Sequence, residues 1–398
     1  MPVYIVANIK ADTGSSAAHG KPSPEMIAAA QRRIDGAIAL EMITDGRVTY
    51  TGDDLALTMV HERGVDSPVI HQFAWRTFEI TTDIATEEGL YAAGQDMRAD
   101  APAGNIRGAG PGVAELEVQF GKTDFSERPS EAVIIFTADK CGPGVWNKWL
   151  GETLWNPNHN TGLLISPELR KGFTVEILDM DYTKGERVLT LELPEQTHEF
   201  VAITRNPDRF AILGVWSRAY PHQRIISAST DRLHNITGTY VGKDDPTMIA
   251  RAQKPFPATE EYSESIATIS LITTGDCRGS HNAVVLPMPI NTAVTGPYCI
   301  PIVSMVGYSL NAKGKLAEQI DFFSGLEWGP IRDDLVRYYR TFREMGAHHV
   351  ALASREEAAY TGIADLDAEL DKQFVVRNPV REEKDVEKAV DAGDTSPS

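Results

Sequence analysis

The chain has 398 residues, enough for one large domain or two ordinary ones, and 42% of them are hydrophobic, so a sizeable core can form. No run approaches the roughly 18 apolar residues that a membrane span needs. The formal net charge of −18 disfavours nucleic acids and anionic membranes as partners.

The N-terminal part of the chain predicts strands and helices in alternation. Residues 3–9 alternate between apolar and small side chains and predict a strand that ends at Asp12. This start has no basic leader and no long apolar middle, so we expect no signal peptide and a cytoplasmic protein. Ser23-Pro24 predicts the start of a helix over residues 22–42. Residues 47–61 predict two strands broken at Gly52-Asp53-Asp54, and residues 67–89 predict a helix.

The middle of the chain is rich in predicted strands, while helices frame both ends. Strand-like runs occupy residues 113–120, 132–140, 173–180, 187–193, 210–216 and 299–310, and helical patterns occupy residues 329–346, 355–360 and 366–374. This order predicts an α+β fold in which sheet packs on sheet with helices outside. The chain has no repeat and no Pro/Gly/Ser-rich linker, so we expect one catalytic domain over residues 1–375. The charged segment 376–398 is expected to be a disordered tail.

The three cysteines, Cys141, Cys277 and Cys299, form no CxxC pair, which argues against a zinc site and a disulfide framework. Buried or half-buried thiols are the simpler interpretation.

The segment GTYVGKDDP, residues 238–246, combines the groups for two chemistries. Lys243 can form a Schiff base with a ketone, and Tyr240 can move the proton that carbon–carbon cleavage requires. Asp244 and Asp245 are hard oxygen ligands suited to Mg²⁺. A solvated turn is the alternative, because Gly, Asp and Pro favour turns.

Further acidic residues stand where predicted strands end. They are Asp12, followed by His19, the pair Asp53-Asp54, and Asp139, followed by Lys140. Ligands gather at such sheet ends in α/β proteins. Two Mg²⁺ ions about 4 Å apart can clamp a phosphoryl displacement between such carboxylates. Surface turns explain most isolated Asp-Asp pairs, and a lone histidine is more often structural than a ligand.

Two more features favour phosphate binding. The glycine-rich loop GNIRGAGPG, residues 104–112, can bring backbone N–H groups close to a phosphate, although its spacing is not that of a dinucleotide-binding fingerprint. Arg278 is a candidate phosphate clamp, with a surface salt bridge as its alternative.

Longer motifs then define a resemblance that runs from residue 9 to about residue 375. They are IKADTGSSAAHGKPS, YTGDDL, GLYAAGQD, GNIRGAGPGVAELE, TADK followed by PG, STDRL, GTYVGKDDPTMIARAQKPFPA, CRGSHN and AYTGI. In these motifs the chain resembles the archaeal-type bifunctional fructose-1,6-bisphosphate aldolase/phosphatases, the class V fructose-1,6-bisphosphatase family.

The resemblance implies a single-domain, four-layer α-β-β-α sandwich that assembles as a homo-octamer, binds several Mg²⁺ ions and acts on a sugar phosphate. The implied reaction is gluconeogenic: dihydroxyacetone phosphate condenses with glyceraldehyde 3-phosphate, and the C1 phosphate is then hydrolysed to give fructose 6-phosphate. The implied metal ligands are Asp12, His19, Asp53, Asp54, Gln95, Asp139, Asp244 and Asp245. The implied substrate-binding residues are His19, Tyr91, Gly104, Asn105, Lys140, Gln253, Arg278 and Tyr360. The implied catalytic residues are Asp12 as the phosphatase base, Tyr240 as the aldolase acid/base and Lys243 as the Schiff-base amine.

The chain also departs from the family pattern. Thr295 stands where the family usually has an aspartate before Gly-Pro, and the segment before Arg278 lacks the usual Trp-Met pair. A diverged paralogue is therefore an alternative, a Schiff-base aldolase or a phosphatase acting on another phosphorylated carbonyl. A non-catalytic, metal-dependent sugar-phosphate binding protein is a third interpretation, which the intact lysine, tyrosine and carboxylate set disfavours.

Overall fold

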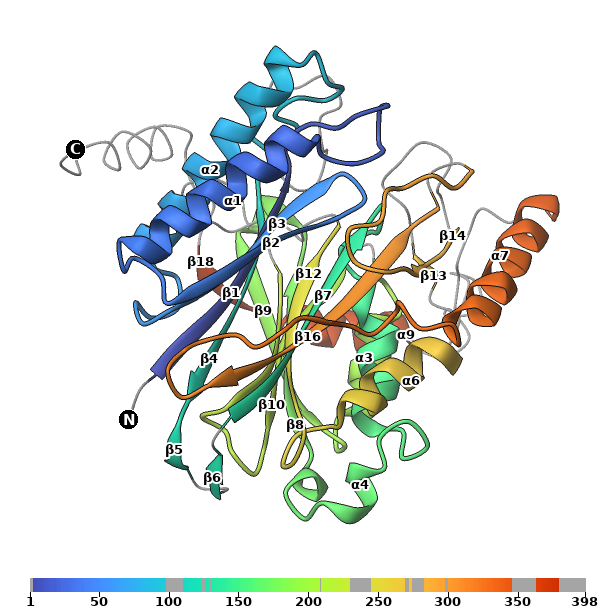
Figure 1. Cartoon of the computed structure of the whole chain (residues 1–398). Coiled ribbons are helices and arrows are strands. Elements are labelled where there is room, and N and C mark those ends of the chain that lie inside the picture. Colours follow the sequence, from blue (N-terminus) through green and yellow to red (C-terminus); the bar gives the residue numbers. More distant parts are fainter. Residues whose placement is uncertain are drawn as a thin grey trace.

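The computed structural model describes residues 3–97, 110–123, 126–128, 130–207, 209–229, 245–268, 272–273, 283–297, 300–345 and 363–378. In this part of the chain a small sheet packs on a larger one, and helices cover the outer faces of both (Figure 1). The fold is the α+β sandwich that the sequence predicts. No helix among the described residues is long and apolar enough to cross a membrane.

The small sheet has four antiparallel strands in the order β2-β3-β1-β4. Their bounds are β1 Val3–Asp12, β2 Asp45–Thr51, β3 Asp54–His61 and β4 Gly112–Gln119. Helices α1 (Pro24–Ala39) and α2 (Pro68–Glu87) cover its outer face, where Ile34 and Phe73 share a buried cluster with Ile9 and Leu57 (Figure 1). Helix α1 begins as predicted, because the Ser23 hydroxyl accepts a hydrogen bond from the Met26 N–H and Pro24 is the first helical residue.

The large sheet has the order β15-β16-β7-β12-β11-β10-β8-β9-β18, with β17 paired to β16. Its strands are β7 Ser130–Asp139, β8 Phe173–Asp179, β9 Glu186–Leu193, β10 Phe210–Ser217, β11 Arg224–Ala228, β12 Thr247–Ala252, β15 Leu286–Pro287, β16 Ile302–Asn311, β17 Ile320–Asp321 and β18 Val375–Asn378. The predicted strands at 113–120, 132–140, 173–180, 187–193, 210–216 and 299–310 are confirmed as β4, β7, β8, β9, β10 and β16.

Helices α3 (Trp146–Trp155), α5 (Thr197–Thr204), α6 (Thr259–Thr268) and α9 (Ile363–Asp371) pack on the outer face of the large sheet. Helix α7 (Trp328–Glu344) packs beside β14 (Ala283–Val284) and β15. Short elements complete the description: α4 Gly162–Ile165, β5 Gly121–Thr123, β6 Ser126–Arg128 and β13 Ile272–Thr273.

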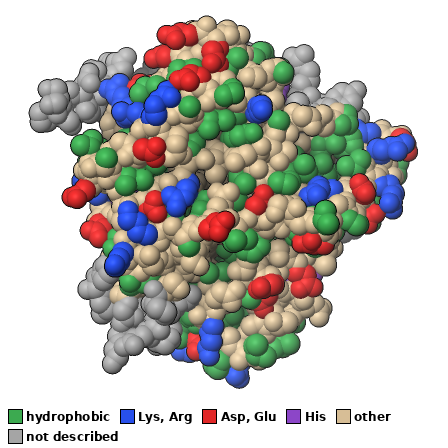
Figure 2. Space-filling view, in the orientation of Figure 1, with side chains coloured by type: hydrophobic (Ala, Val, Ile, Leu, Met, Phe, Trp, Pro, Cys, Tyr) green, Lys and Arg blue, Asp and Glu red, His purple; other side chains and the backbone are tan. Residues whose placement is uncertain are grey.

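The expected disordered tail overlaps the last strand. Residues Val376–Asn378 belong to β18 and pair with β9, so a tail could begin only after them, and residues 379–398 lie outside the described part. Cys141 is buried, as expected, whereas Cys277 and Cys299 are not among the described residues. On the face shown in Figure 2, acidic and basic side chains are interspersed.

The space between the two sheets changes from apolar to polar along the strands. On the inward face of β1, Tyr4 and Val6 belong to a hydrophobic cluster with residues of both sheets. Alternate residues of a strand share a face, so Asn8, Lys10 and Asp12 continue this row. All three are buried. The polar end of the inter-sheet layer is therefore where charged groups are forced together.

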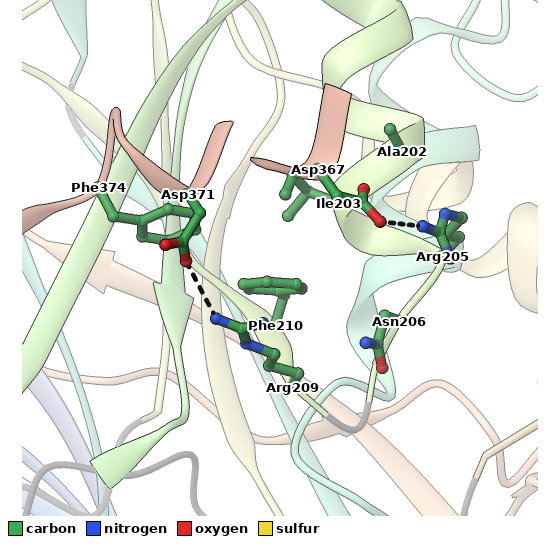
Figure 3. A pocket seen from close by; sticks show the side chains of 9 residues that line it. All are labelled: Ala202, Ile203, Arg205, Asn206, Arg209, Phe210, Asp367, Asp371 and Phe374. Atoms are coloured by element: carbon green, nitrogen blue, oxygen red, sulfur yellow. Dashed lines mark hydrogen bonds and ion pairs between the residues drawn. The ribbon is translucent and has the colours of Figure 1, made fainter. Parts of the chain in front are cut away.

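The C-terminal segment is held by a cluster of ion pairs. Asp179 is fully buried and accepts hydrogen bonds from Arg187 (2.9 Å) and Arg209 (3.0 Å). Asp371 of α9 lies 3.2 Å from both guanidinium groups. Figure 3 shows Asp371 directed at Arg209, and Asp367 at Arg205, around a cavity of about 70 Å³ that Phe210 and Phe374 also line.

The substitution Asp179→Asn is expected to lower the free energy of unfolding by roughly 3 kcal/mol, because removing one partner of a buried ion pair leaves the other charge uncompensated. Asp334→Asn is the control, because Asp334 pairs with Arg337 on an exposed helix face and such pairs contribute about 0.5 kcal/mol or less. Urea unfolding of both variants measures the difference. Equal, small losses would contradict a supporting role for the buried cluster.

Candidate active site

Three buried aspartates from both sheets meet at the polar end of the inter-sheet layer. Asp53 and Asp54 lie in and after the turn between β2 and β3, and Asp139 ends β7. One carboxylate oxygen from each lies within 4.8 Å of those of the other two. The sequence prediction that these residues converge is therefore correct for the three of them.

The turn that carries Asp53 is tight. Gly52 has φ 59° and donates its N–H to the Thr292 carbonyl (2.8 Å), and the Asp53 N–H donates to Asp139 Oδ2 (3.2 Å). A Cβ atom on residue 52 would lie 1.3 Å from Asp139 Oδ2. Only glycine allows the turn and the carboxylate to approach this closely.

Asp12 joins the aspartates from the end of β1. It pairs directly with Asp54 across the strands. Its Oδ1 accepts the Gly14 N–H (2.9 Å), whereas its buried Oδ2 has no hydrogen-bond partner within the described chain. Burial, with the nearby carboxylates of Asp53 and Asp54, raises the pKa of Asp12 well above its usual range.

Lys140 and His19 also contact the cluster. The Lys140 ammonium is hydrogen-bonded to Asp53 and lies 2.8 Å from Asp139 Oδ1. His19 Nδ1 lies 3.3 Å from Asp53 Oδ2, and the Tyr91 ring meets the His19 ring edge-on at 5.1 Å. Lys140 has φ 61°, a left-handed backbone that non-glycine residues rarely adopt and that is enriched at functional sites.

The pKa values of Asp53 and Asp139 shift in opposite directions. Burial acts to raise the pKa of Asp53, but Lys140 and His19 outweigh it and hold that pKa below the usual range. Burial raises the pKa of Asp139 well above its usual value, although Lys140 acts in the opposite direction. The cluster therefore holds more acidic groups than its cations can compensate.

The donor set fits a hard divalent cation. Buried carboxylate and amide oxygens are the ligands that Mg²⁺ accepts in proteins. Asp12 Oδ2 and Gln95 Oε1 are both buried, and neither has a hydrogen-bond partner among the residues described. Gln95 follows the turn that includes Tyr91, whose backbone N–H and carbonyl bond to Ser15 beside Asp12.

Asp245 lies next to the cluster, but its carboxylate is directed at the backbone. Its Oδ1 accepts the Cys141 N–H (2.8 Å), and its own N–H donates to the Cys141 carbonyl (2.8 Å). Gln253 lies elsewhere. Ala252 pairs with Ala132, seven positions before Asp139, which is roughly 23 Å along a strand. Within one chain the structure therefore does not bring Gln253 to the aspartates, because the antiparallel pairing of β12 and β7 carries it away.

The other predicted site residues lie outside the described part of the chain. They are Gly104, Asn105, Tyr240, Lys243, Asp244, Arg278 and Tyr360. One described end of the segment 230–244 is nevertheless beside the cluster, because Asp245 bonds to Cys141, two positions after Asp139. At the other end, Ser229 donates its N–H to the Thr247 carbonyl (2.8 Å) at the start of β12.

Lys10 and Ser15 are site residues that the sequence analysis did not single out. The Lys10 ammonium lies 2.6 Å from Asp54 Oδ2, and the Ser15 hydroxyl lies 3.4 Å from Asp53 Oδ2. The available signal for Lys10 was its spacing, because a charged residue two positions before Asp12 shares its face of the strand.

A larger cavity of about 310 Å³ lies at a different place, beside β4 and β11. Its lining includes Asp66, His71, Glu115, Arg224 and Arg377, and none of the clustered aspartates. This cavity is therefore separate from the acidic cluster.

Comparison with known proteins gives a consistent result over nearly the whole chain. The profile of a family described as fructose-1,6-bisphosphatase matches residues 4–375. The chain is 38% identical over 366 residues to a fructose-1,6-bisphosphate aldolase/phosphatase of Thermus thermophilus, covering 92% of this chain and 98% of that protein. A protein of the same name from Cenarchaeum symbiosum is 38% identical over 355 residues, covering 89% and 90%. One from Moorella thermoacetica is 36% identical over 374 residues, covering 92% and 93%.

Proposed function

Because the chain belongs to the fructose-1,6-bisphosphatase family, as its motifs indicated, we propose that it is a bifunctional, Mg²⁺-dependent fructose-1,6-bisphosphate aldolase/phosphatase. It would join dihydroxyacetone phosphate to glyceraldehyde 3-phosphate and then release the C1 phosphate to give fructose 6-phosphate. The observation that carries the proposal is the buried cluster of Asp53, Asp54 and Asp139 beside Asp12 and Lys140.

Metal binding in this proposal uses four aspartates that the fold brings together. Asp12, Asp53, Asp54 and Asp139 would hold the ions, and Gln95, His19, Asp244 and Asp245 would be the further ligands. Bound Mg²⁺ offsets the charge of the phosphate and orients it for in-line attack.

The phosphatase step needs a group that takes a proton from water. Asp12 suits this role at Oδ2, since Oδ1 already accepts the Gly14 N–H. Lys140 would exchange its contacts with Asp53 and Asp139 for the phosphate oxygens, while His19 and Tyr91 border the same space.

The aldolase step is assigned to Lys243 and Tyr240. The lysine amine would add to the ketone of dihydroxyacetone phosphate and lose water, which leaves an iminium ion. Tyr240, as its phenolate, would take the proton from C3, and the resulting enamine would attack the aldehyde carbon. Tyr240 would return that proton to the aldehyde oxygen, which becomes a hydroxyl group, and water would then hydrolyse the iminium ion to release the lysine. The position of Asp245 beside the aspartates, two residues after Lys243, supports this assignment.

Two assays test the proposal together. Borohydride reduction in the presence of dihydroxyacetone phosphate is expected to fix a covalent adduct on Lys243, and Lys243→Met is expected to lose it. Phosphate release from fructose 1,6-bisphosphate is expected to require Mg²⁺ and to stop with EDTA. If the wild-type protein forms no adduct, the proposed aldolase activity is refuted. If EDTA does not affect phosphate release, the proposed metal dependence of the phosphatase activity is refuted.

The diverged-paralogue alternative has one supporting observation. Thr295 is exposed in a segment that borders the Asp53 turn, because Thr292 accepts the Gly52 N–H and Val294 donates to the Gly20 carbonyl (3.0 Å). Loss of the family's aspartate there would alter a contact close to the substrate. Parallel assays with other sugar bisphosphates test this alternative. A rate of turnover at least about tenfold higher with another sugar bisphosphate than with fructose 1,6-bisphosphate would favour it.

A further inference from the structure

We propose that Lys10 is a positioning residue for the metal site. Its buried ammonium group would hold Asp54, and the backbone at Asp139 and Asp245, in position. In this role it determines how tightly the aspartates bind a divalent cation. The inference rests on the proposed function, because it takes the aspartates to be metal ligands.

The geometry around Lys10 uses every donor of its ammonium group. The side chain is completely buried. Its Nζ lies 2.6 Å from Asp54 Oδ2, 2.5 Å from the Ala138 carbonyl and 2.6 Å from the Asp245 carbonyl. A lysine ammonium has three N–H donors, so three acceptors satisfy it completely.

Each acceptor belongs to a candidate ligand or its direct neighbour. Asp54 begins β3, Ala138 precedes Asp139 at the end of β7, and Asp245 lies at the approach to β12. One ammonium group from the small sheet therefore connects its own sheet to the end of β7 and to the residue two positions before β12. Any displacement of Lys10 would change the separation of ligands that come from different sheets.

Joining the two sheets does not itself require a charge. Two positions earlier on the same face of β1, Asn8 donates to Thr247 Oγ1 (2.6 Å) and accepts from Thr58 Oγ1 (2.9 Å). This neutral side chain connects β3 of the small sheet to β12 of the large sheet without contacting a candidate ligand. A buried ammonium is costly unless it is paired, so the cation at position 10 is explained by the carboxylate that it holds.

The variant Lys10→Met keeps the length of the side chain and removes the ammonium. Its dissociation constant for Mg²⁺, measured by calorimetry with the metal alone and no substrate, is expected to rise at least about tenfold, as for other residues that orient metal ligands. Asn8→Ala is the matched control. It is expected to lower the melting temperature of the metal-free protein while its Mg²⁺ affinity stays within about twofold of wild type.

The results separate positioning from general support. The proposal is overturned if Lys10→Met and Asn8→Ala lower the melting temperature alike and both bind Mg²⁺ as wild type does. Lys10→Gln is a second variant, because its amide keeps a hydrogen bond without the charge, and it must weaken Mg²⁺ binding too. If neither Lys10 variant folds, the residue serves the fold and the proposal fails. A wild-type protein that binds no Mg²⁺ refutes the proposed function as well, whereas normal binding by wild type and Lys10→Met refutes only the inference.

Discussion

Replacing Asp53 by asparagine is expected to reduce Mg²⁺-dependent phosphate release from fructose 1,6-bisphosphate at least about a hundredfold while the fold is retained. The amide has almost the same shape as the carboxylate, but it is neutral and a much weaker ligand for Mg²⁺. Loss of a residue that only orients a metal ligand costs 10- to 100-fold, so loss of a ligand should cost at least as much. Asp53 also contacts Lys140 and His19, and its N–H binds Asp139.

Asp45→Asn is the matched control for this prediction. Asp45 is also a buried aspartate of the small sheet, but it stands at the opposite end of β2. Its oxygens accept hydrogen bonds from the Leu316 N–H (2.9 Å) and from Arg47 (2.7 Å). We expect the control to lose stability and to keep its rate of phosphate release at saturating Mg²⁺. Equal losses of rate in the two variants would show that burial, rather than metal binding, explains the effect.

The sequence contains enough local information to predict the acidic half of the site. Asp12, Asp53 and Asp139 follow runs whose alternation predicts strands, and the Gly52-Asp53-Asp54 break predicts a turn. The structure confirms those strands as β1, β2, β3 and β7. Strand ends that carry carboxylates are natural places for ligands, so the prediction needed no knowledge of which strands pair.

The pairing of strands that are far apart in the sequence cannot be predicted from the residues alone. The strand β12 has the sequence TMIARA and is buried at every position, so it has no alternation between apolar and polar residues that would reveal it. Its antiparallel register with β7 places Gln253 at the far end from Asp139 and brings Asp245 to the cluster. The partners of Lys10 depend on that same register, since one acceptor, Ala138, lies on β7 and another, Asp245, lies two positions before β12.

The substitution Gly52→Ala is the most sensitive test of how closely the two sheets approach at the site. An added Cβ would lie 1.3 Å from Asp139 Oδ2 and 2.9 Å from a methyl group of Val294. Residue 52 connects Thr51 to Asp53, so the turn cannot move away without displacing Asp53. We therefore expect phosphate release to fall at least about a hundredfold and Mg²⁺ binding to weaken at least about tenfold, because both ligands must shift.

Gly64→Ala separates this clash from backbone strain. Gly64 also has a left-handed backbone, with φ 78°, but nothing lies within 4 Å of its Cβ position, whereas Gly52 has φ 59° and no room. Both variants bear the cost of placing alanine in this conformation, about 1–2 kcal/mol. Only Gly52→Ala should lose metal affinity in calorimetry and rate in the phosphate assay. Both variants carry the same kind of backbone strain. The difference between their Mg²⁺ affinities and between their rates of phosphate release therefore measures the contact of residue 52 with Asp139. A Gly52→Ala protein with wild-type Mg²⁺ affinity would mean that the Asp139 carboxylate can leave this position without loss, and Asp139 would then not be a metal ligand.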